Sequence, residues 1–293
     1  ENVVFRGVDA EKTAKLVEDA KTNRYHVKSV KPLPSRKINR EVPLIDCFIA
    51  PCKEGCPIHQ DITTYLQLVG EGKYEEAMDV ITEKNPLPFI TGTICAHACM
   101  GKCTRNFYED PVHIREMKKV AADNGYDALI AKLSAPAVTK EGKAAVVGGG
   151  PAGMAAAYFL RRAGMAVTLF EKKSALGGVV RHVIPEFRIP GTSIDKDTAL
   201  LEKIGVEIRT NTEITSVEAL KGEGYTNVVL AVGAYKPGNV RLEAGEAVNA
   251  LKFLEEFKAK DGNLDLGKVV AVIGGGNTAM DTAPGAKRTK GGG

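Results

Sequence analysis

The spacing of apolar residues along the chain changes once, near residue 135, and this change predicts two kinds of structure. In the front part, apolar positions recur every three or four residues, as in "ITTYLQLV", "YEEAMDVITEK" and "HIREMKKVAADNGYDALIAKL". This spacing is typical of amphipathic helices, and no alternating strand pattern of any length accompanies it. Asp61 stands at the expected N-cap of the first helix and Gly70 at its end, while "NPLP" ends the second. We therefore predict a mostly helical domain over residues 45–137, with one or two helices in its last stretch.

The rear part reads as strands and helices in alternation. "AAVVGGG" is a short apolar run that ends in glycines, "AVTLFE" is a second such run, and "VVLAVG" is a later one, with the helical "AAAYFLRRAG" between the first two. Strand, helix and strand with short connections predict a parallel, doubly wound sheet. "KVVAVIGGGNTAMDTA" repeats the order of strand, glycine loop and helix, and we expect Pro284 and Gly285 to interrupt that helix after barely two turns.

The first 44 residues hold one predicted helix and a connector. Apolar residues at helical spacing predict a helix over Asp9–Lys21. The following "VKSVKPLPSRKINREVP" is basic and contains the proline pair of "PLP", which favours an extended linker. Docking of this segment to a partner is the alternative.

Composition and charge narrow the class of protein. Apolar residues make up 44% and charged residues 26% of the 293-residue chain, as in soluble globular proteins. A net charge of +4 is too small to indicate a nucleic-acid partner. No run of about 18 apolar residues predicts a membrane span, and the opening residues lack the apolar core of a signal peptide. We expect a cytoplasmic protein, and the initial Glu1 suggests a piece of a longer chain.

A glycine loop after the first predicted strand indicates a dinucleotide site. Gly148-x-Gly150-x-x-Gly153 follows a strand and opens a helix, and Glu171 ends the next strand about 20 residues on. The glycines permit a tight turn, close approach to a pyrophosphate and close packing of helix on strand, and the helix N-terminus attracts the phosphates. An acid at this place accepts hydrogen bonds from ribose and disfavours a 2′-phosphate, so FAD or NAD fits better than NADP. A glycine-rich turn without a ligand is the alternative.

Two further features favour FAD in the first loop and a nicotinamide nucleotide in the second. The pair Gly177-Gly178 soon after the acid is typical of two-dinucleotide flavoproteins, and no cysteine follows Cys103, so a neighbouring redox dithiol is excluded. Gly274-x-Gly276-x-x-Ala279 then forms a second loop after a predicted strand. We predict NADH or NADPH there, with a duplicated loop that binds nothing as the alternative.

All six cysteines lie in the front domain, in two short runs. The first run is Cys47, Cys52 and Cys56, and the second is Cys95, Cys99 and Cys103. Without signs of secretion, clustered cysteines favour metal or redox chemistry over disulfides. Structural zinc with His59, His97 or His113 nearby, disulfides and unligated thiols stay open as alternatives.

Taken together, the motifs resemble the glutamate synthase small-subunit family, which includes the N-terminal half of dihydropyrimidine dehydrogenase. The resemblance runs from about residue 45 to the end, through "CKEGCPIHQDI", "ITGTICAHACMGKCTR", "VHIREMKKVA", "GGGPAGMAAAYFLRRAG", "GGVVRHVIPEFRIP" and "GGGNTAMD". Within the family, the chain is most similar to large flavoproteins that carry the label selenate reductase. The resemblance implies a multidomain α and α/β fold: a helical domain with up to two [4Fe–4S] clusters, an FAD domain over 143–265, and the start of an NAD(P)H domain over 266–293.

The resemblance also implies a set of cluster ligands. Cys47, Cys52 and Cys103 would serve one cluster, and Cys56, Cys95 and Cys99 the other. Two clusters want eight ligands, and the family's additional ones would fall at Leu44 and Lys118. Neither residue is a good ligand, so water, an exogenous thiol, His113 or Glu116 would complete a cluster, or one cluster is absent.

The function that the resemblance implies is electron transfer from NAD(P)H through FAD and the clusters to a partner subunit or another domain. The residues predicted to bind the nucleotides are Gly148, Gly150, Pro151, Ala152, Gly153, Glu171, Lys172, Gly177, Gly178, Arg188, Ala231, Gly233, Gly274, Gly276, Asn277, Thr278 and Ala279. Arg188 is also the predicted catalytic charge, near the flavin ring or the nearer cluster, with a surface salt bridge as the alternative. A flavin oxidase or monooxygenase with structural zinc, and a non-catalytic docking module, are the rival functions. We expect this chain alone to bind FAD weakly or not at all, and not to oxidise NAD(P)H unaided.

Overall fold

The computed structural model describes residues 10–22, 49–107, 109–235 and 247–289, which fall into two compact units. One unit takes in residues 1–49 and 104–111, and the other residues 50–103 and 112–293. In the first unit, α1 (Ala10–Thr22) confirms the helix predicted there, and a short 3-10 turn, η2, covers Thr104–Phe107. The predicted linker, Leu44 and Cys47 lie outside the described residues.

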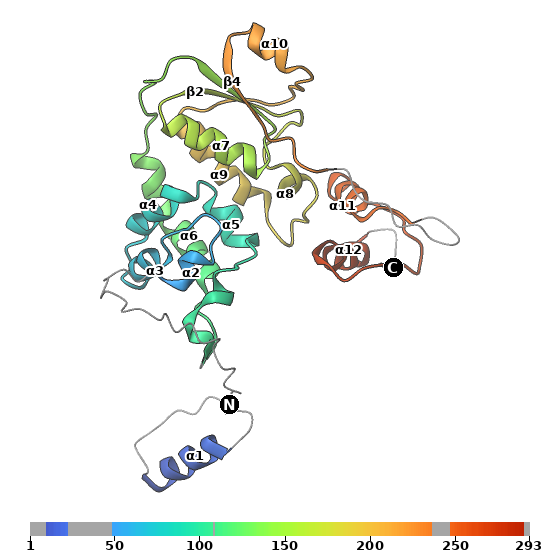
Figure 1. Ribbon diagram of the computed structural model, residues 1–293. Helices are drawn as coiled ribbons and strands as arrows, with labels where there is room; N and C mark the ends of the chain where they lie inside the picture. Colours follow the sequence, from blue (N-terminus) through green and yellow to red (C-terminus); the bar gives the residue numbers. More distant parts are fainter. Residues whose placement is uncertain (1–9, 23–48, 108, 236–246, 290–293) are drawn as a thin grey trace, which may run out of the picture. The chain divides into compact units, whose positions relative to one another are not determined.

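The front part of the second unit is helical, as its pattern predicts. Its elements are α2 (Pro51–Glu54), α3 (Ile62–Gly70), α4 (Tyr74–Lys84), α5 (Pro88–Ile94), η1 (Met100–Lys102) and α6 (Ile114–Lys132), and its described residues form no strand (Figure 1). The last stretch is one helix, α6. Asp61 is the N-cap residue of α3 and Gly70 its last residue. The Asp61 carboxylate binds the hydroxyls of Thr63 and Thr64, however, and no backbone N–H.

These helices bury one apolar core. Tyr65, Met78, Ile81 and Leu129 are each at most 1% exposed, and α4 lies along α6. The Tyr65 hydroxyl donates to the carbonyl of Ile114 at 3.1 Å, so this buried phenol is satisfied. The half-buried Cys52 and Cys56 and the buried Cys99 pack against this core, which therefore helps to position the cysteines.

The rear part contains the predicted parallel sheet. Its strands are β1 (Lys143–Val147), β2 (Ala166–Phe170), β3 (Glu207–Arg209) and β4 (Tyr225–Leu230), in the order β3-β2-β1-β4, and all neighbours run parallel. Val147 pairs with Phe170 on one side and Leu230 on the other, so the carboxyl ends of three strands meet at one edge. The three-residue β3 was not predicted because it is too short to show an alternating pattern.

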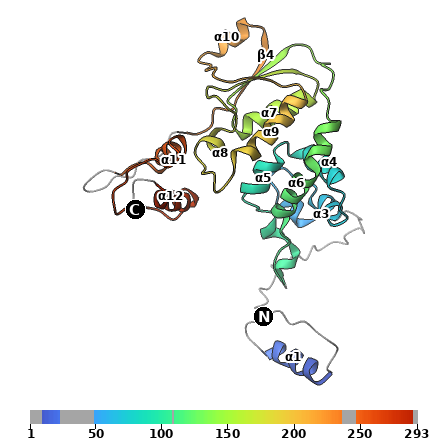
Figure 2. The same cartoon turned by 180° about the vertical axis from the view of Figure 1, so that it is seen from behind.

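Helices cover both faces of the sheet. On one face, α7 (Pro151–Arg162) and α9 (Gly191–Lys203) lie side by side, as both views show (Figures 1 and 2). On the other face, α10 (Val217–Gly222) packs Leu220 against Phe170 and Tyr225. The short α8 (Gly178–His182) precedes α9, and the doubly wound layering is confirmed.

Two predictions for the last part of the chain are wrong. The segment "KVVAVI" forms no strand, and its Val269 is 90% exposed. A strand needs a hydrogen-bonded neighbour, and no described segment pairs with this one. The final helix, α12 (Asn277–Lys287), continues through Pro284 instead of stopping there. Gly285 packs against Phe253 of α11 (Ala250–Ala259), and this contact offsets the hydrogen bond that proline removes.

Candidate functional site

A pocket of about 800 Å³ opens where the carboxyl ends of β1, β2 and β4 meet. Many residues predicted to bind the first nucleotide line it: Gly148, Gly150, Pro151, Ala152, Glu171, Lys172, Gly178, Ala231 and Gly233. The volume lies within the range of small-molecule sites, and the place is the usual one for ligands of open parallel sheets. Because α7 begins at Pro151, its N-terminus faces this space with free backbone N–H groups.

The first and third glycines of the loop meet backbone so closely that no side chain fits. Gly148 has φ +105°, and a Cβ there would lie 2.4 Å from the carbonyl oxygen of Ala231. A Cβ at Gly153 would lie 1.8 Å from the carbonyl oxygen of Gly148. Gly150 has room, since the nearest atom to a Cβ there is the Cα of Gly178 at 3.9 Å. The loop thus has the shape that lets backbone approach a pyrophosphate.

Glu171 binds the same loop from the end of β2. One of its carboxylate oxygens accepts the N–H of Gly149 at 2.7 Å, and the other accepts the N–H of Lys173 at 2.8 Å. The side chain lines the pocket although the residue is only 7% exposed. A carboxylate has about four acceptor positions, so capacity for ribose hydroxyls is left.

The second glycine pair forms the wall that faces this loop. Gly177 donates its N–H to the carbonyl of Gly149 at 2.7 Å, and a Cβ at Gly178 would lie 3.0 Å from the Cα of Gly150. Gly177 has φ +119° and starts α8 as its N-cap residue. Gly178 therefore lines the pocket, while Gly153 and Gly177 do not line it and instead support the loops that do.

Several pocket residues were missed by the sequence motifs, among them the polar Lys173, His182, Tyr235 and Glu255. The carboxylate of Glu255, from α11, accepts the Tyr235 hydroxyl on one oxygen and pairs with the Lys173 ammonium on the other. Burial, followed by the bond to Glu255, raises the pKa of Tyr235 to about 12. The bond from Lys173 lowers the pKa of Glu255. No spacing motif marks these residues, because they come from segments far apart in the sequence.

Arg188 and the second glycine loop do not line this pocket. The Arg188 guanidinium pairs with Asp281 of α12 at 3.0 Å, and Arg188 does not line the pocket. Gly274 has φ +129°, and Gly276 is the N-cap residue of α12, which Asn277, Thr278 and Ala279 begin. These loop residues are exposed, apart from the half-buried Ala279. The role of Arg188 near the flavin stays a prediction.

The described cysteines are free thiols placed at helix ends. Cys52 lies in α2, Cys95 is the C-cap residue of α5, and Cys99 and Cys103 flank η1. Burial raises the pKa of Cys52, and the charges of Cys103 and Cys56 raise it further. Burial likewise raises the pKa of Cys99, with added effects of Cys56 and Cys95. Cys52 of α2 and the cysteines that flank η1 therefore lie close together, and the assignment of individual cysteines to clusters stays a prediction.

Lys118 of α6 lies beside Cys56, Cys95 and Cys99. The residue is only 9% exposed, and burial lowers the pKa of its ammonium, while the charges of Cys95, Cys56 and Cys99 act in the opposite direction. The fourth position that the resemblance assigns to Lys118 is thus next to the predicted cysteine trio. A buried ammonium there offsets the negative charge of the thiolates.

His59 and His113, which the zinc alternative invokes, are exposed. No three His, Cys, Asp or Glu side chains converge on a single ion in the part of the chain that the structure describes. Single zinc ions need ligands at about 2.0–2.3 Å, whereas a four-iron cluster spreads its thiolates over separate corners. His59 and His113 pair with Glu54 and Glu116 at 3.7 and 4.0 Å, and their side chains are 61% and 73% exposed. Thiolates without histidine are the donor set of iron–sulfur clusters.

Family comparison supports both sites. Residues 35–129 match the family described as dihydropyrimidine dehydrogenase domain II, 4Fe-4S cluster. Residues 142–290, half of the chain, match the family described as pyridine nucleotide-disulphide oxidoreductase. The chain belongs to the pyridine nucleotide-disulphide oxidoreductase family. With the iron–sulfur domain in front, it matches the glutamate synthase small-subunit-like group, which confirms the predicted resemblance and fold class.

Several relatives of this oxidoreductase are much longer. YgfK of Escherichia coli K12, an oxidoreductase by name, is 43% identical over 290 residues, which cover 97% of this chain and 28% of YgfK. The NADPH-Fe(3+) oxidoreductase subunit beta of Geobacter sulfurreducens is 35% identical over 81% of this chain and 37% of its own length. Glutamate synthase [NADH] of Saccharomyces cerevisiae is 32% identical over 81% of this chain and 12% of its own length. Among the described helices, none is long and apolar enough to cross a membrane.

Proposed function

We propose that this chain passes electrons from NADH or NADPH through FAD and [4Fe–4S] clusters to another domain or a partner subunit. The observation that carries the proposal is that one compact unit contains both the dinucleotide pocket and five of the six cysteines, Cys52, Cys56, Cys95, Cys99 and Cys103. The names of relatives such as the NADPH-Fe(3+) oxidoreductase subunit beta support a partner. Because thiolates stay reduced in the cytosol, a cytoplasmic location fits the cysteine sites.

The residues of the pocket suit FAD. The backbone of Gly148 to Pro151 and the N-terminus of α7 would bind the pyrophosphate, and Glu171 would bind the adenosine ribose. When bound, FAD supplies the conversion between two-electron hydride transfer and single-electron steps. The Tyr235–Glu255–Lys173 network ties α11 to the segment that follows Glu171, and its polar groups would help to hold the ligand.

The cysteine site suits iron–sulfur clusters. We assign Cys56, Cys95 and Cys99 to one cluster beside Lys118, and Cys52 and Cys103, with Cys47, to the other. The clusters, when present, supply single-electron transfer. Of the described cysteines Cys99 is buried and the other four are half-buried, so the protein would shield the clusters only partly from bulk water. We assign the NAD(P)H site to Gly274 and the start of α12.

Iron and sulfide content tests this proposal. We expect anaerobic reconstitution of the purified chain with iron and sulfide to give a brown protein with both elements bound and an electron paramagnetic resonance (EPR) signal after dithionite reduction. A Cys99→Ser variant, folded as judged by circular dichroism, should lose part of the iron. Wild-type chain that takes up zinc but no iron would favour the zinc-bearing flavin oxidase, and a chain that takes up neither would favour a docking module.

A further inference from the structure

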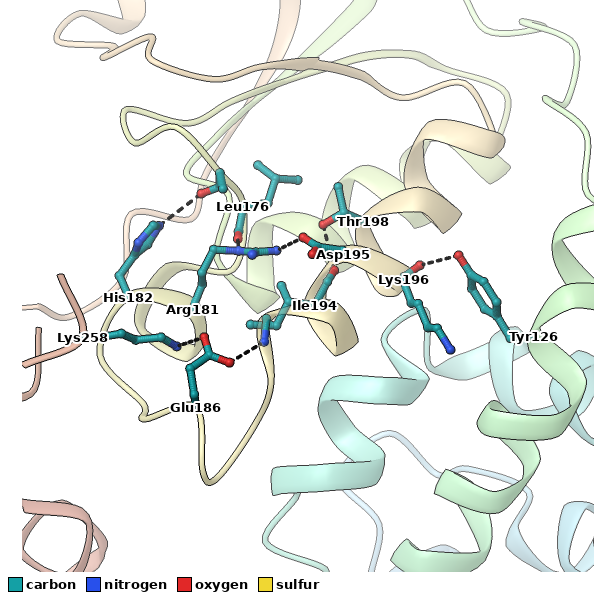
Figure 3. Close-up of polar contacts among 12 residues, drawn as sticks. Tyr126, Leu176, Arg181, His182, Glu186, Ile194, Asp195, Lys196, Thr198 and Lys258 are labelled. Atoms are coloured by element: carbon teal, nitrogen blue, oxygen red, sulfur yellow. Dashed lines mark hydrogen bonds and ion pairs between the residues drawn. The ribbon is translucent and has the colours of Figure 1, made fainter. Parts of the chain in front are cut away.

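Three consecutive residues of α9 contact three other helices. Asp195 pairs with Arg181 of α8, and the carbonyl of Lys196 accepts the hydroxyl of Tyr126 of α6 at 3.3 Å (Figure 3). The next residue, Asp197, binds the first turn of α5. This tripeptide is therefore a junction between the nucleotide-binding part, to which α8 and α9 belong, and the cysteine-bearing helices.

Asp197 caps α5 from outside that helix. One carboxylate oxygen accepts the N–H of Phe89 at 3.1 Å and the other accepts the N–H of Ile90 at 2.8 Å, and the residue is 0% exposed. The N-cap residue itself, Leu87, makes no side-chain cap, and Pro88 has no N–H to offer. The two orphan donors of the first turn are thus satisfied by a carboxylate from α9. Burial raises the pKa of Asp197 to about 8, while the two N–H donors and Lys118 act in the opposite direction.

The other end of α5 sets the place of Cys95. The helix ends at Ile94, and Cys95 is its C-cap residue, with its N–H on the carbonyl of Thr91 at 3.3 Å. Arg115 of α6 donates to the carbonyl of Cys95 at 3.3 Å, and the N–H of His97 donates to its sulfur at 3.4 Å. Because α5 is only seven residues long, a shift of its first turn is passed on to this thiol.

The junction continues to the pocket. Arg181, the partner of Asp195, also donates to the carbonyl of Leu176 and lies on α8, whose first residue, Gly178, lines the nucleotide pocket. The chain of contacts therefore runs from the pocket wall through α8 and α9 to Asp197, and from there through α5 to Cys95.

We propose that Asp197 is a positioning residue that sets Cys95, and the cluster that this thiol binds, relative to the nucleotide pocket. The inference rests on the proposed function, because it assigns Cys95 to a cluster. Asp197 makes no hydrogen bond to Cys95: its carboxylate binds the first turn of α5, and its charge also acts on Lys118 beside the cysteine trio.

The substitution Asp197→Asn tests this role at nearly constant shape. The amide NH₂ cannot accept one of the two N–H donors, so the first turn of α5 loses one of its two bonds to residue 197. We expect alkylation of Cys95 by iodoacetamide in the metal-free chain, followed by peptide mass spectrometry, to become about tenfold faster. In reconstituted chain we expect a changed EPR line shape and a loss of iron per chain. Glu202→Gln, the same change from acid to amide at an exposed position of α9, is the matched control. It should leave the alkylation rate of Cys95, the EPR line shape and the iron content unchanged.

The possible results distinguish the positioning role of Asp197 from the proposed function. A folded Asp197→Asn chain with wild-type alkylation, iron and EPR signal would overturn the positioning role, while the proposed function would stand if wild-type chain still binds iron. If Asp197→Asn does not fold, Asp197→Glu, which keeps the carboxylate, takes its place, and a changed EPR signal in that folded variant supports the role. Failure of both to fold would assign Asp197 to global stability and overturn the proposal. Wild-type chain that binds no iron would defeat the proposed function, and the alkylation assay would still report whether Asp197 sets Cys95.

Discussion

The backbone of Gly153 in α7 packs against the carbonyl of Gly148, so that a Cβ at residue 153 would lie 1.8 Å from that oxygen. This contact joins the first turn of α7 to the end of β1, and the pocket lies directly beside it. A methyl group at residue 153 must therefore displace either the helix or the loop.

We expect Gly153→Ala to destabilise the chain by about 1–3 kcal/mol, the usual cost of forcing a methyl into packed structure. The displaced loop should also weaken FAD binding by about tenfold or more, since misplaced N–H groups no longer meet the phosphates. Urea unfolding and a fluorescence titration with FAD measure the two effects. Gly70→Ala is the control, because a Cβ at that helix end would meet nothing within 4 Å. A Gly153→Ala chain as stable as wild type would contradict the packing described here.

Glu171→Gln should weaken FAD binding without unfolding the chain. The amide offers one acceptor in place of two carboxylate oxygens, so either Gly149 or Lys173 loses its partner and the ribose loses a charged acceptor. We expect about a tenfold to hundredfold rise in the FAD dissociation constant. Glu213→Gln removes another carboxylate from the same pocket and serves as the control. If both variants raise the FAD dissociation constant equally, the total charge of the pocket matters and the specific position of Glu171 does not.

The two cysteine groups should lose iron separately. Replacing Cys56 and Cys95 together with serine removes two thiolates beside Lys118 and leaves the pair Cys52 and Cys103 in place. We expect the reconstituted double variant to keep about half of the wild-type iron and sulfide, because soft thiolates are needed at each site. Loss of all iron would show that the groups form one site, and retention of all iron would remove this trio from cluster binding.

The stability of the chain should depend on the charge state of His182. Burial lowers the pKa of this pocket histidine below its ordinary 6.5, and its ring contacts the carbonyl oxygen of Ala175 at 3.2 Å. Between the lowered pKa and 6.5 the unfolded chain binds more protons than the folded one, so this contribution to stability is present above pH 6.5 and is lost as the pH falls through the folded pKa.

His182→Gln removes this titration while keeping a polar side chain. We expect the difference in the free energy of unfolding between wild type and variant to be constant above pH 6.5 and to shrink below it. Urea unfolding at a series of pH values measures the difference. A gap that stays the same across the series would show that His182 does not titrate differently in the folded chain.

Much of the fold follows from local patterns. Helical periodicity marks α3, α4, α6 and α7, and the glycines after β1 mark the turn, because these features depend on neighbours within a few residues, whereas the short α5 was not predicted. The parallel sheet follows from strands joined by a helix. The same reasoning failed at residues 268–273, where an apolar run has no strand beside it, and at Pro284, where packing on Phe253 carries the helix onward.

The sequence by itself predicted the classes of site, glycine loops for nucleotides and, through the family resemblance, cysteine runs for clusters, because motif spacing is a local feature of the chain. Only the tertiary structure decided which residues complete those sites. Glu255 reaches Lys173 from 82 positions away, and Asp197 reaches Ile90 from 107 positions away. Such contacts are set by how helices pack around a shared core, and no local spacing records that packing.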